Sequence, residues 1–284
     1  MKKFIIKSIK FLFVSVFIFY SKPFYFLYND KYQRIVKSKD VYLAIKKSFN
    51  QNNKKIIILG DSVPFNIFGE KEFENVYSLA SNGAIGVIGQ YLVFYNYLKS
   101  GNLPDEVFLI YSPFSFVVNL DNVFTYNFFV KPFYNDYFIK SISPLAKTQV
   151  LKLPFVSLSR EPYVLTSDWR PDFKSKHLNS YNFISPISLQ YLERLKIICQ
   201  KNKIKFNIIA GPQRQSNKKE IEKFNLLEYK NNKAEEELNF MMSNLKYYPD
   251  SIFRDKVHLK KHIAKDFISF MLKEMNTSRN RNTF

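Results

Sequence analysis

Residues 54–62 read KKIIILGDS, and this stretch does most to decide the fold. Its apolar run, Ile56–Leu59, is short and uninterrupted, with charge before it and Gly-Asp after it. Such a run is typical of a strand that is buried on both faces of a parallel sheet. Similar runs recur along the chain, at 75–83 (NVYSLASNG), 105–113 (DEVFLIYSP) and 204–212 (IKFNIIAGP).

Helical patterns lie between these runs, at 85–101 and 185–202. In the second of them, Ser185 stands where an N-cap belongs and Pro186 stands at the first helical position. Strands that alternate with helices predict βαβ units, and therefore an α/β fold with a doubly wound parallel sheet and helices on both faces. Two further helical stretches are predicted, at 217–246 and 259–275.

One segment interrupts this alternation. Residues 114–182 are rich in Phe, Tyr, Asn and Pro and have weak periodicity. We interpret them as an insertion over the carboxyl edge of the sheet, where such folds place substrate-binding loops. The predicted catalytic domain then covers 55–276, and 277–284 form a tail.

The N-terminus carries a different signal. Four lysines precede an apolar run at 11–21, and the bulky FYSKPFYF that follows offers no cleavage site for a signal peptidase. We therefore predict an uncleaved anchor at 1–29, with a transmembrane helix over residues 4–28, a cytoplasmic N-terminus and a body outside the cytoplasm. A buried first helix is the alternative. Residues 30–54 are predicted to form a juxtamembrane helix or linker.

The net charge and the cysteine content limit which binding partners and which cysteine-based sites the chain can have. The formal net charge is +19, which suits either a polyanionic partner or a solvated, lysine-rich surface. The lysines form no long basic block and no nucleic-acid motif accompanies them, so no nucleic-acid partner is expected. The lone cysteine, Cys199, excludes an intramolecular disulfide and a cysteine-rich zinc site.

Two short blocks carry the residues of catalytic type. Gly60-Asp61-Ser62 ends the first predicted strand, where a serine hydroxyl faces the crevice and the following backbone N–H groups can meet an oxyanion. Near the C-terminus, DSIFRDKVHLKKH (250–262) places Asp255 three residues before His258. An aspartate at this spacing can orient the imidazole and stabilise its protonated form.

Together these blocks resemble the SGNH/GDSL hydrolase superfamily, in which a GDS-like block comes early and a DxxH block comes late. The resemblance implies a three-layer sandwich with a central parallel, flavodoxin-like sheet and the triad Ser62, Asp255 and His258. Gly83, in SLASNGAIG, matches the family glycine that shares the oxyanion hole with Ser62. With its predicted anchor, the chain looks similar to the DltD-like and alginate-acetylation-like members, which act on cell-envelope polymers.

The third family block differs. Members often carry GxND after the third strand, and its asparagine completes the oxyanion hole, whereas this chain reads VFLIYSPFSF. Ser112 stands near that place, and Asn82 or Asn119 is a candidate substitute.

The resemblance implies an O-acyltransferase or esterase that acts on a cell-surface glycan through an acyl-enzyme on Ser62. It implies no metal or cofactor, and leaves room for a membrane-bound acyl-donor protein as a second partner. Trp169 and Arg170 form a candidate sugar-binding pair, with packing as the alternative. The competing hypothesis is a catalytically inactive SGNH-fold subunit that binds glycan or assists assembly. His177 and His262 are interpreted as a loop and a surface histidine.

Overall fold

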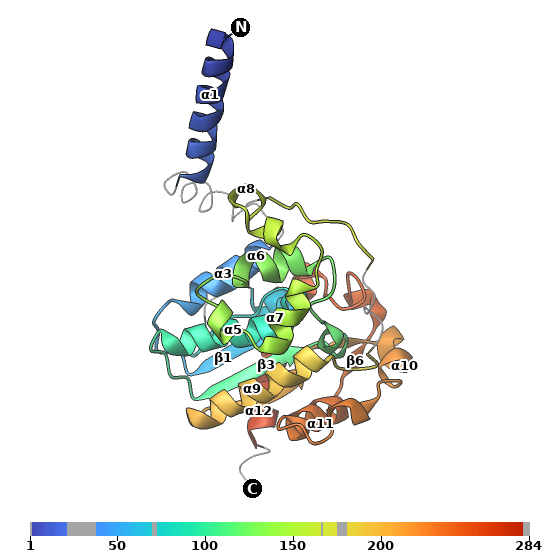
Figure 1. The fold of residues 1–284 in the computed structure, drawn as a ribbon. Coiled ribbons are helices and arrows are strands. Elements are labelled where there is room, and N and C mark those ends of the chain that lie inside the picture. The colour runs from blue at the N-terminus through green and yellow to red at the C-terminus, as the bar shows by residue number, and fades with distance from the viewer. Residues whose placement is uncertain (1, 22–37, 70–72, 166, 175–180, 281–284) are drawn as a thin grey trace.

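A four-stranded sheet forms the centre of the molecule. The computed structural model describes residues 2–21, 38–69, 73–165, 167–174 and 181–280. All neighbouring strands pair in parallel, in the order β2-β1-β3-β4 (Figure 1). Their bounds are β1 (Ile56–Gly60), β2 (Val76–Ser78), β3 (Glu106–Tyr111) and β4 (Lys205–Ala210). Each predicted apolar run therefore contains one strand, and the predicted parallel α/β architecture is confirmed.

Helices cover both faces of this sheet, as Figure 1 shows. One face carries α3 (Lys39–Ser48), α5 (Gly86–Lys99) and α9 (Pro186–Lys201), and the other carries α4 (Ser62–Phe68) and α12 (Lys261–Asn280). Strand side chains alternate between the two cores, since Leu109 packs in the first and the neighbouring Phe108 and Ile110 pack in the second. A strand buried on both faces must be apolar throughout, which explains the uninterrupted runs.

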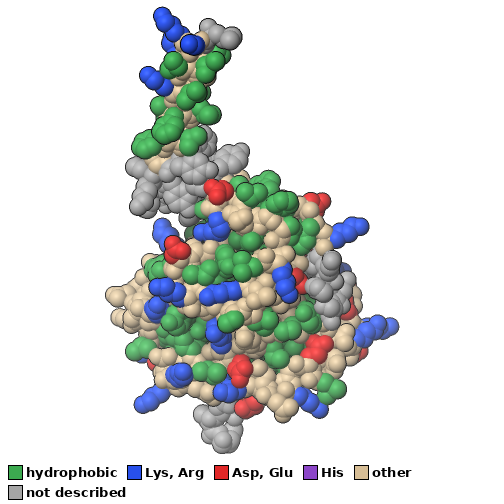
Figure 2. All heavy atoms as spheres, in the orientation of Figure 1, with side chains coloured by type: hydrophobic (Ala, Val, Ile, Leu, Met, Phe, Trp, Pro, Cys, Tyr) green, Lys and Arg blue, Asp and Glu red, His purple; other side chains and the backbone are tan. Residues whose placement is uncertain are grey.

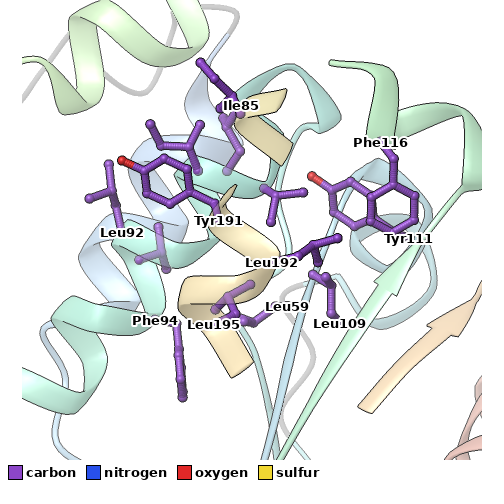
Figure 3. Close-up of a cluster of buried hydrophobic side chains, with 14 of the residues drawn as sticks. Leu59, Ile85, Leu92, Phe94, Leu109, Tyr111, Phe116, Tyr191, Leu192 and Leu195 are labelled. Carbon is purple, nitrogen blue, oxygen red and sulfur yellow. The ribbon is translucent and has the colours of Figure 1, made fainter. Parts of the chain in front are cut away.

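The larger core lies between the sheet and α9. Figure 3 shows Leu59 and Leu109 of the sheet facing Leu192 and Leu195 of α9, and all four side chains are fully buried. The start of α9 is as predicted, because the Ser185 side chain accepts a hydrogen bond from the Ser188 N–H and Pro186 begins the helix.

The predicted helix at 217–246 is wrong. This region instead contains α10 (Lys218–Ile221), η7 (Leu226–Tyr229) and α11 (Glu235–Ser243), and a short parallel pair, β5 (Gln213–Arg214) with β6 (Tyr247–Tyr248), flanks it. Asparagines break the helix. The Asn225 side chain caps a new turn at the Leu227 N–H, and Asn231 adopts a left-handed backbone with a φ of 66°.

The predicted insertion is packed against the first core. Its aromatic residues Tyr126, Phe129 and Phe133 are fully buried there. The elements of its described residues are short helices: η2 (Pro113–Val117), η3 (Tyr126–Val130), α6 (Lys131–Phe133), η4 (Ile139–Ser141), α7 (Pro144–Leu151), η5 (Val156–Arg160) and α8 (Pro162–Leu165). Elements of this length give no extended periodicity, which is why the sequence indicated only an insertion.

The expected transmembrane helix is not found. The N-terminal segment forms α1 (Lys2–Tyr20), which extends away from the body in Figure 1. Among the described residues, no helix combines the length and the apolarity that a bilayer crossing requires. Lysines at positions 2, 3, 7 and 10 leave only a short uninterrupted apolar run in α1, and residues 22–28 of the predicted span lie outside the described residues. The 39–48 part of the predicted linker is α3, which packs on α5 through buried residues such as Val41.

Candidate active site

The candidate site begins where β1 ends, at Gly60. Its φ is 152°, and a Cβ at this position would lie 2.1 Å from the Ile110 carbonyl oxygen, so only glycine fits. The buried Gln90 side chain of α5 binds both backbone polar groups of Gly60. The Gly60 N–H donates to Gln90 Oε1 at 3.0 Å, and Gln90 Nε2 donates to the Gly60 carbonyl at 2.6 Å. The chain therefore leaves the sheet in one defined direction.

Asp61 then turns the chain into α4. It is the N-cap of that helix, and its Oδ1 accepts from the Val63 N–H at 2.8 Å. Ser62 is consequently the first helical residue, at the carboxyl end of the sheet, and its side chain is partly exposed.

The second Asp61 oxygen ties this turn to the end of β3. Oδ2 accepts from the Ser112 N–H at 2.8 Å and from the Ser115 hydroxyl at 2.6 Å. Burial raises the pKa of Asp61, although the Ser115 hydroxyl and the N–H groups of Ser112 and Val63 oppose the rise by stabilising the carboxylate. Asp61 thus joins the loops after β1 and β3 without itself facing solvent.

The opposite side of the site is a closed loop before α12. It starts at η8 (Asp250–Ile252) and is closed by an antiparallel bridge between the buried residues Phe253 and Leu259. The Arg254 N–H donates to the His258 carbonyl at 2.8 Å. This loop carries Asp255 and His258.

The structure brings the three predicted catalytic side chains together. Ser62 Oγ lies 2.6 Å from His258 Nε2, and His258 Nδ1 lies 2.9 Å from both carboxylate oxygens of Asp255. With the proton on Nδ1, the imidazole donates to Asp255 and accepts from the Ser62 hydroxyl. The His258 side chain is 21% exposed, so the chain of hydrogen bonds opens to solvent on one side.

Asp255 remains ionised over a wide pH range. Burial works against its charged form, but the N–H groups of His258 and Val257 and the His258 ring outweigh burial and lower the pKa of the carboxyl to about 2. The two backbone donors lie 2.9 and 3.0 Å from Oδ1 and also fix the orientation of the carboxylate.

Gly83 lies beside the nucleophile turn. A Cβ at this glycine would lie 3.3 Å from Asp61 Cβ, so the Gly83 backbone approaches the turn closely. Gly83 begins η1 (Gly83–Ile85), and the Asn82 side-chain oxygen caps this helix at the Ala84 N–H, 3.0 Å away. The Asn82 side chain also faces the Asp40 carboxylate closely enough to oppose the burial that raises the pKa of Asp40. Asn82 therefore acts on its own loop and on α3.

Neither of the other two polar candidates reaches the triad. Ser112 is buried, its N–H is bonded to Asp61, and its hydroxyl has no partner among the described residues. Asn119 is buried farther along the chain, where its Nδ2 donates to Asp121 at 3.2 Å.

The predicted sugar-binding pair belongs to the insertion. Trp169 is 41% exposed, and the Arg170 guanidinium lies over the Phe124 ring at 5.2 Å. The buried ammonium of Lys131 fixes the segment around Trp169, because it donates to the carbonyls of Ser167 and Trp169 at 2.8 and 2.7 Å. Among the described residues, no hydrogen bond, ion pair or ring contact joins this pair to the triad. His262 is exposed on α12, and His177 lies outside the described residues.

Sequence reasoning missed the residues that support the triad. Gln90 carried a usable signal, because it is the only strongly polar residue in the apolar stretch 84–94. Ser115 and Asn217 carried none. The Asn217 amide donates to the Lys256 carbonyl at 2.8 Å and so steadies the histidine loop across a distance that sequence patterns do not encode.

The sequence was compared with protein-family models and with proteins of curated function. No family model matches the chain, and no protein of curated function matches its sequence.

Proposed function

We propose that this protein is a serine esterase or O-acyltransferase of the SGNH/GDSL type. The observation that carries the proposal is the hydrogen-bonded chain Ser62–His258–Asp255 at the carboxyl end of a parallel sheet. Nucleophile, base and orienting carboxylate are the three groups that acyl transfer through a serine requires. The order of the residues along the chain and the parallel sheet agree with the resemblance.

In the first half-reaction, Ser62 Oγ attacks the carbonyl carbon of an ester while His258 Nε2 takes the hydroxyl proton. The negative charge moves to the carbonyl oxygen, which the N–H groups of Ser62 and Gly83 are proposed to hold. Asp255 stabilises the imidazolium. Asn82, predicted as a further donor, contributes by fixing the loop that presents Gly83.

The first half-reaction ends when the tetrahedral intermediate collapses: the alcohol oxygen of the ester leaves with the proton from His258, and the acyl group remains on Ser62. The second half-reaction runs through the same steps in reverse. A hydroxyl group of an acceptor, or water, then gives its proton to His258 and attacks the acyl carbon. The ester or acid that forms leaves with the acyl group, and the proton returns to Ser62.

The proposed substrate is a cell-surface glycan, with the domain outside the cytoplasm and attached to a membrane through its N-terminal segment. The membrane attachment is supported by α1, whose apolar side chains are exposed and whose lysines lie in its N-terminal half. The glycan and the location outside the cytoplasm rest on the resemblance. A reporter that is active only in the cytoplasm, fused after residue 284, should be silent. A bright signal would contradict both the location and the glycan assignment.

A fluorophosphonate probe tests the serine mechanism. The folded protein should be labelled stoichiometrically, because an activated serine attacks the phosphorus and displaces fluoride. Ser62→Ala should abolish labelling, while the control Ser251→Ala, at an exposed serine near the histidine loop, should not. Folded wild-type protein that remains unlabelled would instead favour an inactive, glycan-binding subunit, for which the missing third block is the supporting observation.

A further inference from the structure

A cavity lies in the insertion, and no residue of the triad lines it. Its volume is about 570 Å³, a size typical of sites for small organic molecules. Three segments form its wall: the chain after η2, the end of α7 with the turn that follows, and the described residues around 173 and 181.

The wall contains two amide oxygens that lack hydrogen-bond partners among the described residues. Asn119 and Gln149 both line the cavity, and the side-chain oxygen of each is buried without a hydrogen bond among the described residues. The Asn119 amide nitrogen is already committed to the Asp121 carboxylate, which fixes the oxygen as the free end. Buried polar atoms are normally paired, so these two oxygens call for hydroxyl or amine donors from a ligand.

The rim is cationic. Lys152 and Lys174 line the cavity and are exposed, and neither forms an ion pair with a described carboxylate. Among the described residues of the wall, Asp121 supplies the one carboxylate, and it accepts from the Asn119 amide. Two free ammonium groups against one engaged carboxylate favour an anionic ligand.

Aromatic rings form the rest of the wall, and one of them is held by a hydrogen-bonded tyrosine. Phe173 meets Tyr126 edge to face at 5.9 Å, and the Tyr126 hydroxyl donates to the carbonyl of Pro154, another wall residue. Phe173 and Tyr181 both line the cavity and are only partly buried. Partly exposed rings can pack against the C–H face of a sugar.

We propose that this cavity binds a polyhydroxylated anion of one or two sugar rings, at a site separate from the triad. The amide oxygens accept from ligand hydroxyls, the two lysines pair with a carboxylate or phosphate, and the rings cover the apolar face. This site does not depend on the serine mechanism, because it shares no residue with it.

Titration calorimetry with the full chain tests the proposal, using glucuronate, glucose 6-phosphate, glucose and inorganic phosphate as probes. The two anionic sugars should bind at least about tenfold more tightly than glucose, and the carboxylate and phosphate arms show which anion is preferred. Replacing both Lys152→Gln and Lys174→Gln should remove that preference and leave glucose binding unchanged. Gln149→Leu should weaken all three sugars.

Two controls keep the test decisive. Lys147→Gln changes a lysine of α7, the helix that ends just before Lys152, and this lysine does not line the cavity, so the variant should bind as wild type does. Ser62→Ala should also bind as wild type does, even where labelling of the serine is lost. Failure of every sugar to bind folded protein at millimolar concentration would overturn the proposal. Equal affinity for inorganic phosphate and glucose 6-phosphate would overturn it too, since hydroxyl recognition would then be absent.

Discussion

At the scale of single residues, His258 is the point on which the proposed chemistry depends, because its two ring nitrogens contact Ser62 and Asp255. Ser62→Ala and His258→Ala should each lower ester hydrolysis by about 10⁴-fold or more. The double variant should be hardly slower than either, since the two groups act as a unit. Turnover of a chromogenic acetyl ester measures this.

Asp255→Asn should leave more residual turnover than the other two variants, because Asp255 only orients and stabilises the ring. His262→Ala, at an exposed position on α12, is the matched control and should keep wild-type turnover. Full activity of the purified Ser62→Ala variant would contradict the proposed serine mechanism.

Asp255 also predicts how stability depends on pH. Its pKa is lowered in the folded state from an ordinary value of 3.8 to about 2, so its charged form stabilises the fold. That contribution is complete above pH 4 and is lost as the pH falls towards 2. Urea unfolding at a series of pH values should therefore show Asp255→Asn less stable than wild type at neutral pH, with the difference shrinking below pH 4. A difference that stays constant down to pH 2 would contradict the assigned hydrogen bonds.

At the scale of elements, the turn from β1 into α4 is the part that places Ser62, and α5 supports it through Gln90. Gln90→Leu keeps the side-chain size but leaves the buried Gly60 N–H without its partner. We expect a loss of about 1–3 kcal/mol in the free energy of unfolding. A shift of the turn should also lower turnover by up to about 100-fold, because small displacements of a nucleophile are costly.

The matched control for this variant is Gln200→Leu, at an exposed position near the end of α9. It should change neither unfolding nor turnover. Unfolding in urea and ester hydrolysis measure both variants side by side. If Gln90→Leu were as stable and as active as wild type, the turn would be held by its other contacts, chiefly those of Asp61.

At the scale of the whole molecule, charge and the N-terminal helix act together. Figure 2 shows Lys and Arg side chains spread over the visible face, and the net charge is +19. The α1 helix adds exposed aromatic residues, among them Phe11, Phe13 and Phe17. A cationic body with an exposed apolar helix should bind anionic lipid surfaces.

Sedimentation with vesicles rich in phosphatidylglycerol tests this attachment. The chain should pellet with the vesicles, and the triple change of Phe11, Phe13 and Phe17 to serine should leave most of it in the supernatant. Lys265→Gln, at an exposed site on α12, is the control and should pellet as wild type does. Equal sedimentation of the triple variant would show that α1 does not make the attachment.

Features that depend on a local pattern of residues can be predicted from the sequence alone. Burial on both faces makes a parallel strand apolar throughout, so all four strands of the sheet were visible as runs, and Ser185 with Pro186 marked the start of α9. The blocks around Ser62 and His258 were also visible, because their residue types and spacing are set by chemistry.

The contacts between groups far apart in the sequence depend instead on how the elements pack. The Ser62–His258 contact spans 196 positions, and Ser115 reaches Asp61 across 54. The breaks within 217–246 and the burial of the aromatic insertion were equally hidden from sequence patterns. Such features arise when the sheet brings the ends of its strands to one edge and the remaining segments pack around it. A sequence pattern indicates which face of a helix or strand is apolar, but it does not indicate which other element will pack against that face.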